Sequence, residues 1–518
     1  MSFSQTMLSL DNVPGDILEY IAIALCVTDR PLGPPSSLSA LLRTCRSVYN
    51  VLSFSANKPL YGRIFKMTFD SSVALRRLGL QSLTAAALAD ELVLRFTVMK
   101  RFRSGEGSIE PDRELLDARE VEQITQGLWT AYFMVLENEG KNIEMLRIYA
   151  RINTWILDYL FDANGASFIN DEIRQEIWPE PSVNICLAMS LAWFFLEPSR
   201  IGIGGQRTLK MFSLGSHRYS PSSLSWNDFR RDRPPNALES SDVKFYGRDR
   251  SFYAPSIVPT AILSFLSLMA STPFMTRPTL TLAFPENVSA KGDTTVLNSS
   301  TRWESEWMRT LPAPSDKHGP CWINGCMDGI WEGKFTYMDF SDFAALRHDV
   351  PPGFLQASLI AQHDQFWTLR EHHLLTTENA TTEPLPIGDA LSAFLPKGCA
   401  MVEDSTGINM QEPGKSQVVR YVRWNKNEFP LVCQSKDIVI VGEGHSNWGR
   451  FILKGRVRKS DGFVTLLKEY TDGPRGSWLY RGYVIGHPGG NLVGRWRDTI
   501  TPSLHAGYEG CFALTPRK

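Results

Sequence analysis

The residues best placed to do chemistry in this chain of 518 residues are arginines within apolar strands near its end. In residues 478–485 the side chains should alternate in direction, as they do along any β-strand. One side carries Trp478, Tyr480 and Val484, and the other carries Leu479, Arg481, Tyr483 and Ile485. Because both sides are apolar, the Arg481 guanidinium should be partly desolvated and should need an anionic partner.

Arg495 and its neighbour Trp496 repeat this arrangement in a second expected strand. Arginine binds carboxylates through paired hydrogen bonds, so an acidic side chain of a target protein could supply the anion. An internal carboxylate such as Asp498 or Glu509 could do the same, and the sequence favours this structural pair. Arg481, Arg495 and Trp496 are the candidate residues for recognition of an acidic target protein.

Motifs for catalysis and metal binding are missing from the sequence. There is no Gly-x-Ser-x-Gly turn, no Gly-x-Gly-x-x-Gly and no phosphate-binding loop. Cys321 and Cys326 lie close together, but no second cysteine pair or paired histidines complete a zinc site. Glu371, His372 and His373 form a polar cluster that we interpret as a solvated loop. We therefore expect no enzyme activity, no catalytic residue, no metal and no cofactor.

The composition is that of an ordinary folded protein, with 43% hydrophobic residues, 21% charged residues and a net charge of -1 at pH 7. Nucleic-acid-binding proteins usually carry an excess of positive charge, so that class gains no support. The eight cysteines are scattered, as in proteins with reduced thiols. The apolar stretches are too short to span a bilayer, and residues 1–10 show no secretory signal. We expect a cytoplasmic or nuclear protein with no membrane or nucleic-acid partner.

Residues 11–70 contain three short helical patterns. The first ends at the proline-rich residues 28–35, which cannot continue a helix. The second is a single amphipathic helix over residues 38–52, with apolar side chains at helical spacing throughout. The third begins near Pro59. Such a small helical unit buries little surface by itself and usually needs a partner or a following domain.

This segment resembles an F-box. Val13-Pro14-Gly15-Asp16-Ile17-Leu18 is similar to the Leu-Pro-x-Glu-x-Leu that opens the motif, residues 41–49 to its central Leu-x-x-Cys-Arg, and residues 57–61 to its closing Ser-Pro-x-Leu-Trp. The resemblance implies binding to the Skp-type adaptor of a cullin ubiquitin ligase through apolar side chains. The implied contacts are Pro14, Ile17, Leu18, Leu41, Leu42, Val48 and Tyr49. Some of these must also hold the helices together, and a plain helical start to the next domain is the alternative.

Residues 320–518 contain short strand-like runs separated by glycine turns, as in an antiparallel barrel or a sandwich. Gly329-Ile330-Trp331 resembles the Gly-x-Trp that opens lipocalin-type barrels, where the tryptophan plugs one end. The whole stretch resembles the barrel that follows the F-box in large fungal families. We interpret residues 376–416 as a long surface loop, and the basic stripe of residues 449–458 as a solvated outer face. This stripe consists of Arg450, Lys454, Arg456 and Arg458.

We therefore expect a multidomain α+β protein with an F-box at 1–72, a helical region at 73–319 that is irregular from 200, and a lipocalin-like β-barrel at 320–518. The implied function is that of the substrate-recognition subunit of a Skp-cullin-F-box ubiquitin ligase, in which the barrel selects the target protein. The alternative is a lipocalin-like small-molecule binding protein, since such barrels can enclose one ligand.

Overall fold

The computed structural model describes residues 10, 13–27, 32–214, 229, 240–270, 302–312, 321–347, 351, 353, 355, 360–375, 383–425, 427, 435–473, 475–486, 489–505 and 507–517. The chain forms two compact units. Unit 1 comprises Met1–Asp158 and Asp242–Ser251, and unit 2 comprises Tyr159–Ser241 and Phe252–Lys518. The helical region expected at 73–319 is therefore divided between the two units.

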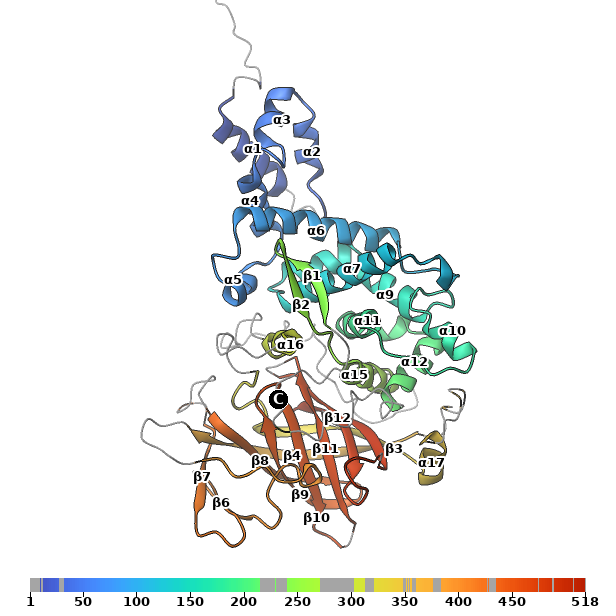
Figure 1. Cartoon of the computed structure of the whole chain (residues 1–518), viewed down its shortest axis with the longest axis vertical. Helices are drawn as coiled ribbons and strands as arrows, with labels where there is room; N and C mark the ends of the chain where they lie inside the picture. The colour runs from blue at the N-terminus through green and yellow to red at the C-terminus, as the bar shows by residue number, and fades with distance from the viewer. Residues whose placement is uncertain are drawn as a thin grey trace, which may run out of the picture. The chain divides into compact units, whose positions relative to one another are not determined.

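Unit 1 is mainly helical, with one small sheet (Figure 1). Its helices are α1 (Gly15–Val27), α2 (Ser36–Leu42), α3 (Arg46–Leu52), α4 (Lys58–Thr68), α5 (Ser72–Leu78), α6 (Ala85–Ser104), α7 (Ala118–Leu136) and α8 (Lys141–Glu144), followed by a π-helical turn (Met145–Tyr149). The next helix, α9 (Ile152–Phe161), begins in unit 1 and ends in unit 2. The sheet pairs β1 (Ser241–Phe245) with β2 (Arg248–Phe252). The start of α4 near Pro59 is as expected, because the Asn57 side chain caps it by accepting from the Leu60 backbone N–H.

The single helix expected over residues 38–52 is wrong, because α2 and α3 are separate helices. Cys45 is fully extended, with φ -158° and ψ 164°, and this conformation breaks the helical path. The Thr44 hydroxyl donates to the Leu41 carbonyl at 2.7 Å, which satisfies an acceptor at the end of α2. Apolar spacing persists across the break, so periodicity alone could not reveal it.

A buried ionic cluster fastens the small sheet to the helices of unit 1. The Arg95 guanidinium, fully buried on α6, donates to Glu91 at 2.9 Å and to Glu137 at 2.6 Å. Tyr246, in the β1–β2 turn, donates its hydroxyl to Glu137 at 3.0 Å and its backbone N–H to Glu91 at 2.9 Å. A buried ion pair of this kind needs these extra hydrogen bonds to offset desolvation.

Unit 2 contains a closed antiparallel barrel of eight strands. The strands are β3 (Gly329–Met338), β4 (Ile360–Leu375), β8 (Ser435–Ser446), β9 (Gly449–Arg458), β10 (Phe463–Tyr470), β11 (Ser477–Ile485), β12 (Asn491–Asp498) and β13 (Glu509–Pro516). Closure follows from β3, which pairs with β4 along one edge and with β13 along the other. The barrel alternative is thereby confirmed over the sandwich.

Side chains fill the interior of the barrel. Trp331, the tryptophan of Gly329-Ile330-Trp331, is 1% exposed in this core, and its indole N–H donates to the Met327 carbonyl at 3.1 Å. Trp367 and Phe512 lie in the same core. The barrel strands therefore enclose a packed core in the manner of small eight-stranded barrels.

The expected loop over residues 376–416 is wrong in part. Within it, β5 (Ala400–Asp404) and β6 (Gly407–Gln411) form a hairpin that continues through β7 (Val418–Arg423) to the end of β4. The solvated loop expected at Glu371, His372 and His373 is also wrong. All three lie on β4 and are at most 1% exposed. The prediction of a solvated loop failed because both faces of β4 are covered here, so that its polar side chains are buried.

Glu371 has a structural role, because it holds the segment before β3. Its carboxylate accepts from the Trp322 indole N–H at 3.0 Å, the Gly325 N–H at 2.8 Å and the Met327 N–H at 3.1 Å. These bonds fix the segment before β3 against β4. Among the described residues no group of three His, Cys, Asp or Glu side chains could hold a metal ion.

Unit 2 also contains helices, some of which cover part of the outer barrel face. They are α10 (Ile169–Arg174), α11 (Val183–Phe194), α12 (Ile203–Leu214), α15 (Ile257–Ala270), α16 (Glu304–Thr310) and α17 (Phe340–Arg347). α15 packs on β11, β12 and β13, and α12 packs on α15 and β13 (Figure 1). In the part of the chain that the structure describes, no helix is long and apolar enough to cross a membrane.

Candidate functional site

The N-terminal helices divide the seven expected adaptor contacts into two groups. Leu18, Leu41 and Val48 are at most 8% exposed and form the interior of the helical bundle. Ile17 on α1 and Tyr49 on α3 face outward, with 47% and 54% of their surfaces exposed. Of the remaining two, Pro14 is exposed and Leu42 is half-buried. The three buried residues can only support the surface from within, whereas the four exposed or half-buried residues can contact a partner directly.

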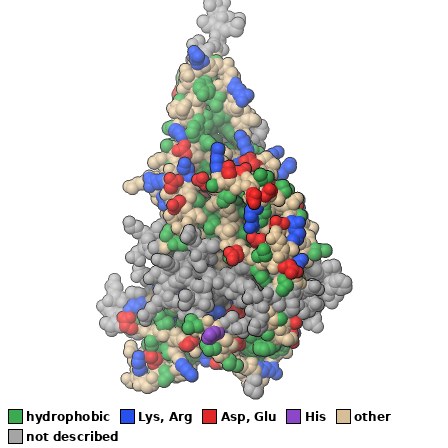
Figure 2. All heavy atoms as spheres, turned by 45° about the vertical axis from the view of Figure 1, so that its right-hand side comes forward, with side chains coloured by type: hydrophobic (Ala, Val, Ile, Leu, Met, Phe, Trp, Pro, Cys, Tyr) green, Lys and Arg blue, Asp and Glu red, His purple; other side chains and the backbone are tan. Residues whose placement is uncertain are grey.

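Tyr20 adds an apolar side chain that the sequence reasoning missed. It lies on α1 three residues after Ile17, is the only aromatic side chain of this helix and is 71% exposed. Residues three apart lie on the same face of a helix, so Ile17 and Tyr20 are neighbours. This spacing was visible in the sequence and could have identified Tyr20. Figure 2 shows hydrophobic side chains gathered over the N-terminal helices on the face in view.

Hydrogen bonds hold the outward-facing helices in place. Glu19 of α1 accepts from the Asn57 side chain at 2.8 Å and pairs with Arg63 of α4. The Tyr61 hydroxyl donates to the Leu52 carbonyl at 3.0 Å and so joins α4 to the end of α3. The exposed apolar side chains therefore project from a bundle with its own internal order.

The candidate arginines of the barrel lie beneath other elements. Arg495 is 2% exposed, and its guanidinium donates to Glu509 at 3.1 Å and to the Ser213 carbonyl at 2.8 Å. Arg495 thus has an internal carboxylate partner, one of the two that the sequence suggested. Trp496 points into the barrel core and donates to the Thr336 carbonyl at 2.9 Å.

Arg481 lies directly across from Arg495 on the neighbouring strand and is 6% exposed. Burial is the main reason that its pKa falls to about 10, and Arg497 and Arg495 lower it further against the attraction of Glu509. This cluster of positive charge with one carboxylate is covered by the helical side of unit 2. A recognition role for Arg481, Arg495 and Trp496 stays a prediction.

The solvated basic stripe expected on β9 is wrong for Arg456 and Arg458, which are 2% and 1% exposed. Arg456 pairs with Asp437 at 2.7 Å and also donates to the carbonyls of Leu385 and Phe394. These bonds fasten residues 385–395 to the barrel wall. Strand alternation correctly placed these arginines on the outer face of the barrel. It could not show that residues from elsewhere in the chain cover them.

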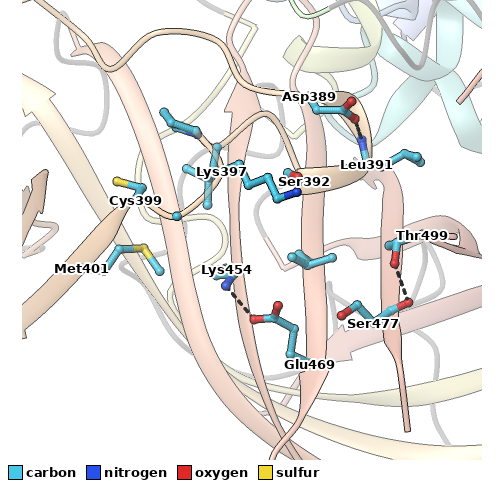
Figure 3. A pocket seen from close by; sticks show the side chains of 14 residues that line it. Asp389, Leu391, Ser392, Lys397, Cys399, Met401, Lys454, Glu469, Ser477 and Thr499 are labelled. Atoms are coloured by element: carbon cyan, nitrogen blue, oxygen red, sulfur yellow. Dashed lines mark hydrogen bonds and ion pairs between the residues drawn. The ribbon is translucent and has the colours of Figure 1, made fainter. Parts of the chain in front are cut away.

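That segment helps to form a hollow of about 460 Å³ on the outer wall of β9, β10 and β11 (Figure 3). Leu395, Pro396 and Cys399 line one side of it. On the opposite wall Lys454 and Glu469 form an ion pair at 2.6 Å. This hollow is open and lined by both polar and apolar side chains. Its Lys454 and Glu469 side chains already pair with each other.

Lys468 of β10 is the most unusual polar residue of the barrel interior. Only 1% of it is exposed. Its amine lies 3.9 Å from the ring centre of Phe451, 4.9 Å from Tyr470, 5.2 Å from Phe335 and 5.5 Å from Tyr480. Burial lowers the pKa of Lys468 to about 7. Sequence alternation could have found this residue, because Val464 and Leu466 continue on the same face to Lys468.

No protein-family model, curated protein or solved structure matches this chain.

Proposed function

We propose that this protein is the substrate-recognition subunit of a cullin-type ubiquitin ligase and that α1–α4 bind a Skp-type adaptor. One observation carries the proposal. The small N-terminal bundle already buries Leu18 and Val48 inside, yet it exposes Ile17, Tyr20 and Tyr49 outside. Apolar side chains gathered on an ordered surface are typical of protein-binding sites. The resemblance of residues 13–61 to an F-box is the reason for proposing a Skp-type adaptor as the partner of this surface.

In this proposal the chain itself performs no chemistry. The N-terminal helices bind the adaptor, the barrel domain selects the target protein, and the partner enzyme transfers ubiquitin to the target held nearby. The lipocalin-like character of the barrel is part of the same proposal, supported by its eight antiparallel strands and by Trp331 in its core.

A pull-down with a purified Skp-type adaptor tests the proposal. We expect the full chain to bind with a dissociation constant of micromolar or lower, roughly -8 kcal/mol or stronger. The double variant Ile17→Glu, Tyr49→Glu should weaken binding by about a hundredfold, since a few apolar anchors usually dominate such interfaces. Its circular dichroism should match that of the wild type because both side chains are half exposed.

The matched control is Ile500→Glu, which introduces the same charge at a side chain that is 90% exposed in unit 2. It should bind the adaptor as the wild type does. If the wild-type chain fails to bind, or if the double variant binds as tightly as the control, the proposed function is wrong.

A further inference from the structure

Strand β5 forms an open edge of the large sheet. Among the described strands, β5 lies at the end of the sheet order and pairs only with β6. The backbone N–H and C=O groups along its other side therefore face no partner strand in the described part of the chain. Proteins often protect such an edge with proline or lysine, because it can pair with another extended chain. The sequence of β5, Ala-Met-Val-Glu-Asp, contains neither residue.

The acidic side chains of β5 offer little protection, because both are paired internally. Glu403 pairs with Arg370 at 2.6 Å, and Asp404 pairs with Arg420 at 2.7 Å. Val402, in the middle of the strand, is 66% exposed. The β5 edge thus combines unpaired backbone groups with an exposed apolar side chain. These are the features by which an extended polypeptide adds to a sheet as a further strand.

The hollow of about 460 Å³ lies beside the beginning of β5 (Figure 3). Cys399 and Met401 line it on the β5 side, and Leu395 and Leu467 continue the apolar lining toward the barrel wall. Side chains alternate in direction along an extended segment. A segment paired with β5 would therefore direct every second side chain toward the hollow, whose volume is sufficient for a large apolar side chain.

Lys397 provides the charge that is available at this hollow. Glu469 already pairs with Lys454 at 2.6 Å. Asp389 accepts from the Leu391 backbone N–H at 2.6 Å and so caps a turn of the covering segment. Lys397 also lines the hollow, is exposed, and forms no ion pair with any described residue. An acidic side chain on the incoming segment would complement its ammonium group.

We propose that the β5 edge and the hollow beside it bind an extended segment of the target protein as an additional strand. A large apolar side chain of this segment occupies the hollow, and an acidic side chain next to it pairs with Lys397. Backbone hydrogen bonds to β5 supply affinity, and the two side-chain contacts supply selectivity. The assignment to a target protein rests on the proposed ligase function, in which the barrel domain selects the target.

A second copy of this chain is the other candidate for the β5 edge. Pairing of two β5 strands would join only the five residues of β5 from each copy. Stable interfaces between proteins use about 20 to 30 residues from each side. The small size of the edge therefore favours a short segment over a second copy.

Selection from a library of random octapeptides displayed on phage tests the proposal with the full chain. We expect the selected peptides to share alternating apolar positions with a neighbouring aspartate or glutamate. Fluorescence polarisation then measures the affinity of each labelled peptide. Val402→Asp places a further negative charge on the β5 edge and should weaken binding at least about tenfold. The matched control is Val418→Asp, at a half-exposed position of β7, which lies inside the sheet and should bind as the wild type does.

Reversal of the charge at position 397 tests the side-chain selectivity separately. Lys397→Glu should weaken binding of the acidic peptides at least about tenfold, and selection on this variant should recover peptides with lysine or arginine in place of the acidic residue. Lys100→Glu, an exposed position of α6 in unit 1, is the control and should leave the selection unchanged.

Hydrogen exchange reports strand pairing directly. A bound peptide should slow exchange of the amides of residues 400–404, which lie at the open edge. Binding without this protection, equal affinity for the Val402 and Val418 variants, or recovery of no binding peptide would overturn the proposal. A wild-type dimer in ultracentrifugation that Val402→Asp dissociates would assign the β5 edge to a second copy and also overturn it.

The peptide experiments contain no adaptor, so they can be separated from the test of the proposed function. A chain that binds these peptides at β5 but no Skp-type adaptor would refute the ligase function alone. A chain that binds the adaptor but no peptide at β5 would refute the docking proposal alone.

Discussion

Lys468 shows how one side chain can be recognised as unusual by comparison with its neighbours. Positions 464 and 466 on the same face of β10 are Val and Leu, as expected for the inside of a filled barrel. The amine at position 468 is buried among rings, and desolvation is the single cause of its lowered pKa. The residue therefore destabilises the protonated barrel, a consequence that stability measurements can detect.

The stability of the barrel should rise with pH because of Lys468. Its pKa is about 7 in the folded chain and ordinary, near ~10.4, in the unfolded chain. Between these values the unfolded state binds the additional proton, so the free energy of unfolding should increase by up to about 1.4 kcal/mol per pH unit. Below pH ~7 both states are protonated and the penalty is constant. Urea denaturation at pH 6, 7, 8 and 9 measures this dependence.

Lys468→Met should remove the rise, and the variant should be more stable than the wild type at pH 7. Lys454→Met serves as the control and should keep the wild-type pH dependence. A wild-type chain and a Lys468→Met chain with parallel stability curves would show that Lys468 is ordinary in the folded protein.

At the scale of elements, buried charges pair with residues far apart in the sequence. These pairs hold one element against another. Arg456 of β9 joins residues 385–395 to β8 through Asp437, which also accepts from the Tyr421 hydroxyl of β7 at 2.6 Å. The barrel wall, the β5–β7 extension and the covering segment therefore share one polar cluster. The Arg456 guanidinium links the covering segment to this cluster.

Arg456→Met should release this segment. Breaking a buried pair by removing one partner typically costs 3 to 5 kcal/mol, since Asp437 would remain buried without its cation. Limited proteolysis should then cut within residues 385–395, where the wild-type chain resists. Arg450→Met, an exposed position on the same strand, is the matched control. Equal resistance of the Arg456 and Arg450 variants would contradict the fastening role.

At the scale of the whole molecule, the two units contain separate sets of contacts. The N-terminal bundle is stabilised by Leu18, Val48 and the Glu19 hydrogen bonds, all within unit 1. The barrel and its covering helices lie within unit 2. Damage to one unit should therefore leave the binding properties of the other intact.

Arg495→Ala provides this test. It leaves Glu509 and the Ser213 carbonyl without their buried partner, so the barrel should lose about 3 to 5 kcal/mol of stability and melt earlier. Adaptor binding through α1–α4 should be unchanged at a temperature below that transition. Calorimetry with a parallel pull-down measures both. Loss of adaptor binding in step with barrel stability would mean that the two units do not act separately.

Local patterns in the sequence determined the type and order of most elements. Helical spacing and proline stops predicted helices at the N-terminus, although the second of them is divided into α2 and α3. Alternation with glycine turns predicted an antiparallel barrel or sandwich. The same alternation correctly separated Leu479, Arg481 and Tyr483 from Trp478 and Tyr480. These patterns suffice because the side-chain direction in a helix or strand is set by the backbone over a few residues.

Only the tertiary structure decided what covers each face and which charges meet. Strand alternation cannot tell an exposed outer wall from one covered by a distant segment, so Arg456 and Arg458 were expected in solvent and are buried. Likewise, Arg495 meets Glu509 because β12 and β13 are paired, and Lys468 is enclosed because β3, β9 and β11 bring their aromatic rings around it. Burial and pairing depend on contacts between residues far apart in the chain, which spacing within one segment does not specify.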